Sequence, residues 1–215
     1  MKKDLKPIWL YLAIYFGIQF IIGFILGIIY MNNAIEMVNK LSAIITFISY
    51  LVVTITFIFI YRNQLKLKIK KMTKKDYIYT LVGAAILIFV NVILYKLFSG
   101  MNVKMENQET IMEAYQNSKI LMLVSVILFA PFVEEMVFRY SLSTLIKNDS
   151  VFVIVSSLIF GLMHGIGLAS IIYISLGVVL SLIYLKTNKN VVASTIAHIL
   201  NNAFAMITIL IMIRL

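Results

Sequence analysis

Three charged residues stand close together inside an apolar stretch of the second half of the chain. Glu134 and Glu135 are adjacent, and Arg139 follows Glu135 by four residues. Charged groups cost several kcal/mol at membrane depth, so they are rare there and usually functional. Residues four apart share a helix face, which favours an ion pair between Glu135 and Arg139. Neighbouring residues on a helix point about 100° apart, so Glu134 lacks a local cation and becomes a candidate general base.

The two histidines of the chain also lie in or at the end of apolar stretches. His164 ends one stretch, whereas His198 and Asn202 are four apart on another. A lone histidine in an apolar helix is more often a packing residue. Together with Glu134, however, two imidazoles and an amide supply a base, a group that orients water and donors for an oxyanion. A buried polar cluster that only fixes helix packing is the alternative interpretation.

Seven apolar runs must position these residues. The runs cover about residues 7–31, 41–61, 77–98, 120–146, 151–164, 168–185 and 191–213. A transmembrane helix needs about 20 apolar residues. The sequence therefore predicts an all-α, polytopic membrane helix bundle of about seven transmembrane helices. The fifth run is short for a span, and Gly165 and Gly167 predict a break or tight turn after it.

Composition supports a membrane protein and excludes several other classes. The chain is 62% hydrophobic and 13% charged, whereas a soluble domain is about half apolar and a quarter charged. It has no cysteine, which excludes disulfides, thiolate metal sites and cysteine nucleophiles. The net charge of +10 comes from lysines in the short loops between apolar runs. That pattern is typical of cytoplasmic loops, so we expect no nucleic-acid partner.

The distribution of loop charges predicts the orientation in the cell membrane. With the N-terminus inside, 13 Lys and Arg residues fall in inner loops and 5 in outer loops or ends. The inner set is Lys2, Lys3, Lys6, Arg62, Lys66, Lys68, Lys70, Lys71, Lys74, Lys75, Lys147, Lys186 and Lys189, and the outer set is Lys40, Lys96, Lys104, Lys119 and Arg214. Because positive charge is retained on the cytoplasmic side, a multi-pass protein with a cytoplasmic N-terminus is expected.

The polar residues of the apolar runs also form three motifs. In chain order these are Glu134-Glu135-x-x-x-Arg139, Phe160-x-x-x-His164 and His198-x-x-x-Asn202. Their order and separate helices resemble the CPBP family, which includes CAAX prenyl endopeptidases of the Rce type and bacterial Abi-type membrane proteins. The resemblance covers about residues 120–215, which we expect to form the catalytic helix core. Residues 1–119 hold N-terminal transmembrane helices and loops that resemble no family.

The resemblance implies proteolysis inside the membrane. By analogy with the family, Glu134 activates a water molecule with help from His164. His198 and Asn202 then stabilise the oxyanion. The substrate implied is a peptide or protein, and the lipid bilayer is the other partner. The oligomeric state is not indicated.

The supporting residues and a metal ion come from the same analogy. Glu135 and Arg139 would support the catalytic residues without contacting the substrate themselves. No cofactor is required by the motifs, although a divalent metal such as zinc stays open, with Glu134, His164 and His198 as its ligands. The two histidines do not have H-E-x-x-H spacing, and a metal-free water activated by glutamate also fits these residues.

Three functions follow from these residues. The first is an endopeptidase that acts on prenylated CAAX proteins in eukaryotes. In bacteria it would act in the maturation of secreted peptides such as bacteriocins or signalling peptides, or in self-immunity. The second is a non-catalytic membrane scaffold or regulator of the same fold. The third is a proton-coupled transporter, because intramembrane Glu and His also form proton relays, but the chain shows no internal repeat of the transporter kind.

Overall fold

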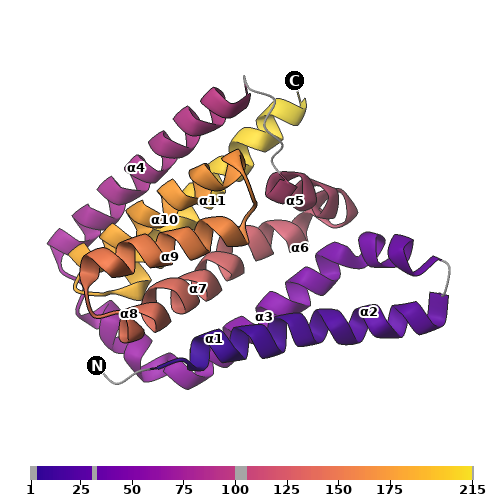
Figure 1. Ribbon diagram of the computed structural model, residues 1–215, viewed down its shortest axis with the longest axis horizontal. Helices are drawn as coiled ribbons and strands as arrows, with labels where there is room; N and C mark the ends of the chain where they lie inside the picture. Colours follow the sequence, from indigo (N-terminus) through magenta and orange to yellow (C-terminus); the bar gives the residue numbers. More distant parts are fainter. Residues whose placement is uncertain (1–3, 31–32, 100–105, 215) are drawn as a thin grey trace.

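The computed structural model describes residues 4–30, 33–99 and 106–214, and within these ranges it contains helices and no strand (Figure 1). The elements are α1 (Lys6–Tyr11), η1 (Leu12–Phe16), α2 (Gly17–Tyr30), α3 (Ala34–Lys70), α4 (Lys74–Ser99), α5 (Glu106–Asn117), α6 (Lys119–Val124), η3 (Ser125–Phe129), α7 (Ala130–Glu135), η4 (Met136–Ser141), α8 (Leu142–Leu145), α9 (Asp149–Met163), α10 (Leu168–Lys186) and α11 (Val191–Arg214). The η elements are π-helical turns. Residue 31 of the first predicted run, and Lys2, Lys3 and Lys104 of the charge count, lie outside the described residues.

Helix length and composition confirm the predicted all-α membrane bundle. Among the described residues, six helices are long and apolar enough to cross a membrane. They are Lys6–Tyr30, Ala34–Lys70, Lys74–Phe98, Lys119–Leu145, Leu168–Lys186 and Val191–Ile211. Helix α9 is apolar but has 15 residues, which give about 22 Å and fall short of the ~30 Å hydrocarbon core. The predicted break follows it, where Gly167 has φ +87°, a conformation that glycine adopts readily.

Helices α9 and α10 form a closely packed antiparallel pair. A Cβ atom added to Gly177 of α10 would lie 2.9 Å from the Cα of Ser157 on α9. Small residues allow such close approach between membrane helices. Helix α4 packs against both α10 and α11. The N-terminal part, residues 1–119, therefore shares its packing with residues 120–215, and the division between the two stays a prediction about where the chemistry lies.

The first long helix runs alongside α3 and is anchored at its beginning (Figure 1). The carboxylate of Asp4 accepts hydrogen bonds from the hydroxyls of Tyr61 on α3, at 3.0 Å, and Tyr140 on η4, at 3.3 Å. The N–H of Asp4 donates to Oγ1 of Thr144 at 2.9 Å. Farther along, the side chain of Phe20 is 74% exposed. The chain start is thus tied to the helix that carries Glu134, while much of α2 offers an apolar face to lipid.

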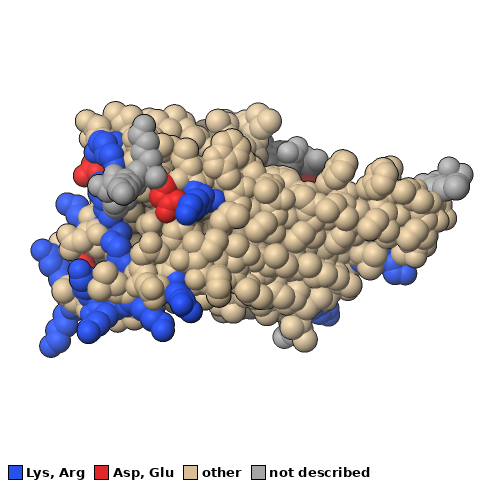
Figure 2. All heavy atoms as spheres, turned by 90° about the horizontal axis from the view of Figure 1, so that it is seen from below, with Lys and Arg blue, Asp and Glu red and all other residues tan. Residues whose placement is uncertain are grey.

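Positive charge gathers at one end of the molecule. Figure 2 shows Lys and Arg concentrated at the left, the end at which Figure 1 places the N-terminus and α8. The junctions α3–α4, α8–α9 and α10–α11 supply exposed lysines there, namely Lys66, Lys70, Lys71, Lys74, Lys75, Lys147 and Lys186. These seven lysines of the predicted inner loops therefore share one end of the bundle. That this end faces the cytoplasm stays a prediction.

Candidate active site

Two π-helical turns interrupt the long helix that carries the paired glutamates. Glu134 and Glu135 end the short segment α7, which lies between η3 and η4. Single π-turns inside α-helices are rare and occur frequently at functional sites, because each turn leaves backbone groups without their usual partners. The glutamates therefore lie on a helix whose backbone pattern is irregular on both sides of them.

The Glu134 carboxylate faces both imidazoles of the chain. Its Oε1 atom lies 3.8 Å from Nε2 of His164, and its Oε2 atom lies 3.8 Å from Nε2 of His198. The three side chains are 12%, 17% and 6% exposed, respectively. These distances are too long for direct hydrogen bonds, but each pair of atoms is spaced so that one water molecule could bridge it.

The ring of His164 is held in place from two sides. It stacks on Tyr173 of α10 with centroids 4.8 Å apart and lies 4.4 Å from the ring of Phe160. Its Nδ1 atom is 2.7 Å from the carbonyl oxygen of Phe160. Because a carbonyl only accepts, Nδ1 carries the hydrogen, and Nε2 is the atom turned to Glu134. Asn107 of α5 donates to the Tyr173 hydroxyl at 3.3 Å.

The ion pair expected from the i, i+4 spacing is present and lies behind His198. Nε of Arg139 is 3.4 Å from Oε2 of Glu135, and both side chains are fully buried. The other Glu135 oxygen lies 3.2 Å from Nδ1 of His198. Arg139 donates to the carbonyl of Gly177 at 3.3 Å and lies over the ring of Phe160, 4.7 Å from its centroid. Glu135 therefore contacts His198 directly. Within the described part of the chain, the Glu134 carboxylate has no basic side chain within ion-pair distance other than the two imidazoles.

Asn202 belongs to a chain of amides between helices. Its Nδ2 donates to the carbonyl of Val126 in η3 at 3.0 Å, and its Oδ1 accepts from Nδ2 of Asn201 at 3.2 Å. Asn201 in turn accepts from Asn91 of α4 at 3.4 Å. The amide of Asn202 is thus fixed at both of its polar atoms.

One cavity of about 440 Å³ brings four predicted site residues together. Glu134, His164, His198 and Asn202 all line it. Glu135 and Arg139 lie outside its lining and are fully buried. The grouping comes from three separate helices, so it rests on tertiary packing. Their predicted roles stay predictions at this point.

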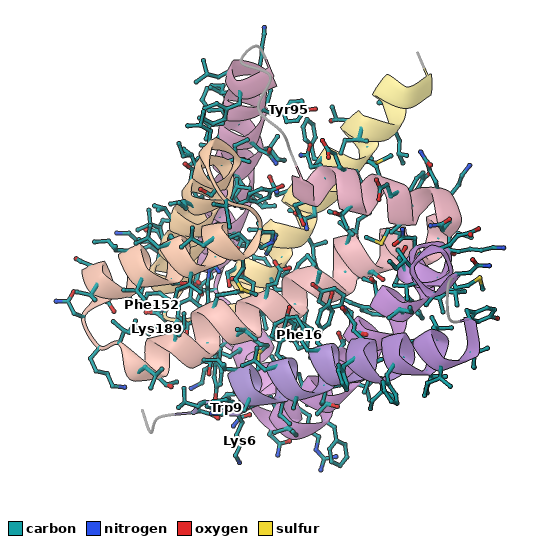
Figure 3. All side chains as sticks on the ribbon, turned by 45° about the vertical axis from the view of Figure 1, so that its right-hand side comes forward. Lys6, Trp9, Phe16, Tyr95, Phe152 and Lys189 are labelled. Carbon is teal, nitrogen blue, oxygen red and sulfur yellow. The ribbon has the colours of Figure 1, made fainter. Side chains whose placement is uncertain are left out.

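The same cavity is also lined by residues outside the sequence motifs. Tyr11, Tyr15 and Tyr50 from the N-terminal helices line it, as do Asn91 and Tyr173. A signal was available for two of them, because Tyr11 and Tyr15 are four apart on an otherwise apolar helix. Figure 3 shows Phe16 between this helix and the helix that carries Glu134, with Trp9 on the outer side.

The donor atoms around Glu134 stand farther apart than the ligands of a bound zinc ion. In the part of the chain that the structure describes, no three His, Asp or Glu side chains form a group that could hold one. Zinc ligands at 2.0–2.2 Å from the ion lie about 3.4 Å from one another in a tetrahedron. The oxygen–nitrogen separations around Glu134 are each 3.8 Å.

Comparison with known proteins finds the same region. Residues 116–204 match the family model of the Rce1-like type II CAAX prenyl endopeptidases. The chain is 31% identical over 161 residues to the membrane-embedded CAAX protease MroQ of Staphylococcus aureus strain USA300. The matched region covers 68% of this chain and 64% of that protein. The chain thus spans slightly less than two thirds of the length of this relative. No solved structure matches the chain.

Proposed function

Because the chain belongs to the CPBP family of intramembrane proteases, we propose that it is an intramembrane endopeptidase that hydrolyses peptide bonds with a water activated by Glu134 and His164. The observation that carries the proposal is the position of the Glu134 carboxylate. It lies 3.8 Å from each of two imidazole Nε2 atoms, at the wall of a cavity between membrane helices.

The proposed first step is the activation of water. A water between Glu134 and His164 donates one hydrogen bond to the carboxylate and one to the Nε2 lone pair of the imidazole. This leaves an oxygen lone pair for attack on the scissile carbonyl carbon. Glu134 takes the proton that the water loses, as a general base. The hydrogen bond from Nδ1 of His164 to Phe160 supports this role, because it keeps Nε2 available as the acceptor.

The proposed second step is the collapse of the tetrahedral intermediate. Asn202 and His198 donate hydrogen bonds to the oxyanion. Since Nδ1 of His198 donates to Glu135, Nε2 donates only when the ring carries a second proton. The scissile C–N bond then breaks, and the proton held by Glu134 passes to the leaving amine. Glu135 and Arg139 hold His198 in this orientation.

We propose that the substrates are peptides that enter or lie at the membrane. Small secreted peptides, such as bacteriocins or signalling peptides, fit this role, in their maturation or in self-immunity. The relative from Staphylococcus aureus is named as a membrane-embedded CAAX protease, which supports a substrate presented at the bilayer. We further propose that the lysine-rich end of the bundle faces the cytoplasm.

The test is cleavage by purified protein in detergent. Wild type, Glu134→Ala and His164→Ala are incubated with a peptide library, with and without a chelator, and products are read by mass spectrometry. We expect wild type to cleave in both conditions and both variants to lose cleavage. Cleavage that persists in Glu134→Ala contradicts the assignment of the base. Loss of cleavage in chelator alone, restored by added zinc, contradicts the metal-free step.

A further inference from the structure

The helix that carries Glu134 has a backbone carbonyl, that of Val126, which lacks the donors that an α-helix or a π-turn would supply, and this carbonyl accepts from Asn202. In η3 the N–H of Ala130 bonds to the carbonyl of Ser125, five residues back. The next residue, Pro131, has no N–H. The carbonyl of Val126 therefore finds no donor at i+4, where Ala130 is already engaged, or at i+5, where proline stands.

A carbonyl withdrawn from water costs free energy if it has no partner, and here a side chain takes the place of the missing donor. Nδ2 of Asn202 donates to Val126 O at 3.0 Å across the helix–helix contact between η3 and α11. The π-turn and Pro131 thus leave an acceptor that a residue on the facing helix satisfies.

The opposite end of the same amide is fixed by Asn201. Nδ2 of Asn201, whose residue is buried, donates to Oδ1 of Asn202 at 3.2 Å. Asn91 on α4 donates to the Asn201 oxygen at 3.4 Å, which selects the orientation in which the Asn201 nitrogen points to Asn202. Asn91 lies outside residues 116–204, so the N-terminal half contributes to this chain of amides.

A carboxamide has two N–H donors and one oxygen. In Asn202 the oxygen is used by Asn201 and one N–H by Val126. Among the described residues the second N–H has no acceptor, and Asn202 lines the cavity that holds Glu134. A rotation of the amide by 180° would lose both bonds, so the second N–H remains without a partner on a residue that lines the cavity.

We propose that Pro131, Asn201 and Asn91 are positioning residues that lock the carboxamide of Asn202 with a single N–H free for the oxyanion. The inference rests on the proposed function. Donors that are fixed before the reaction stabilise the transition state without reorganisation. Loss of this lock should therefore lower kcat and leave KM unchanged.

The first test is kinetic and uses the peptide that wild type cleaves in the library assay. Asn202→Ala is expected to lower kcat about 100-fold, the size seen when one oxyanion donor is lost. Pro131→Ala supplies an N–H that competes for the Val126 carbonyl, and Asn201→Leu removes the donor to Asn202. Each variant is expected to lower kcat about tenfold, which corresponds to about 1.4 kcal/mol of lost transition-state stabilisation. Asn91→Ala should have a smaller effect, because Asn91 acts through Asn201.

Matched controls come from the same residue types elsewhere in the chain. Pro7→Ala replaces the proline in the first turn of α1. Asn117→Ala removes an exposed amide that donates to the carbonyl of Asn39 at 2.9 Å. Both controls should keep the wild-type kcat.

A double-mutant cycle separates positioning from a structural role. In the Asn202→Ala background, Pro131→Ala and Asn201→Leu should cause no further loss, because both act through the missing amide. Multiplied losses in that background overturn the inference. If Pro131→Ala and Asn201→Leu keep the wild-type kcat while Asn202→Ala loses activity, the positioning inference is overturned and the oxyanion role of Asn202 stands. A wild-type kcat in Asn202→Ala overturns the oxyanion role given to it in the proposed function.

A second measurement is independent of activity. Infrared spectra of protein with ¹³C at the Val126 carbonyl report the hydrogen bond from Asn202. We expect the stretching frequency to rise in Asn202→Ala and to stay unchanged in Asn117→Ala. An unchanged frequency in Asn202→Ala would show that the Val126–Asn202 bond is absent, and the lock would be rejected.

Discussion

The first long helix of the N-terminal half and α10 of the C-terminal half use their side chains differently. In the most apolar part of Lys6–Tyr30, 6% of residues are buried, whereas in Leu168–Lys186 the share is 50%. The buried, mutually contacting side chains Glu135, Arg139 and His198 belong to the C-terminal half. Lipid tails are as apolar as leucine, so apolar side chains on the first helix face lipid without cost. Small residues and polar contacts therefore hold the C-terminal helices together, and these contacts fix the site.

The sharpest test of this contrast replaces one carboxylate in each half. Glu134→Gln should lower kcat about 1,000-fold, because it removes the proposed general base. Glu36→Gln, at an exposed position near the beginning of α3, should leave kcat unchanged. Steady-state peptide cleavage measures both. A similar kcat for the two variants would remove the functional difference between the halves.

Next in size is the loss of the buried cation. Arg139→Met leaves the fully buried Glu135 carboxylate without its partner, and such losses cost about 3–5 kcal/mol. Asp149→Asn breaks an exposed ion pair between Asp149 and Lys189, in which the Asp149 side chain is 58% exposed. This loss should cost about 0–1 kcal/mol. Unfolding of the protein in mixed micelles gives both free energies. Equal costs would mean that the buried pair does not hold the C-terminal half.

A smaller effect is expected at the stacking partner of His164. Tyr173→Leu removes the stacked ring and should lower kcat about tenfold or less, given the energy of an aromatic pair. Tyr173→Phe keeps the ring and loses only the hydrogen bond from Asn107, so its kcat should stay near wild type. The same peptide assay separates the two variants. If Tyr173→Phe lost as much as Tyr173→Leu, the hydroxyl rather than the stack would orient the imidazole.

The smallest effect should come from the lipid-facing side of α2. Phe20→Ala removes a side chain that is 74% exposed and should change the free energy of unfolding by less than about 0.5 kcal/mol. Phe152→Ala on α9, which is buried, should cost about 3 kcal/mol or more. Unfolding in mixed micelles compares them directly. A large cost at Phe20 would show that this face packs against protein.

The sequence predicted the elements and the motif residues because each depends on local spacing. The apolar runs predicted the long helices, and four-residue spacing predicted the contact between Glu135 and Arg139. The break after His164 followed from two glycines. These features need only helix periodicity and backbone preference.

The rest of the site depends on contacts between helices. No spacing indicates that Glu134 lies midway between His164 and His198, because the three residues come from separate helices. The bond from Asn202 to Val126 needs a π-turn, which the sequence does not predict. The four-residue spacing of Tyr11 and Tyr15 is visible in the sequence, but only the packing of the helices places these two tyrosines at the cavity.

The most direct test of the account is the source of the oxygen in the new carboxyl group. Wild type and Glu134→Gln are incubated with the cleavable peptide in H₂¹⁸O, and the products are weighed by mass spectrometry. We expect one ¹⁸O atom in the new C-terminal carboxylate with wild type and no product above background with Glu134→Gln. Equal, ¹⁸O-labelled product from both proteins would contradict the claim that Glu134 activates the water.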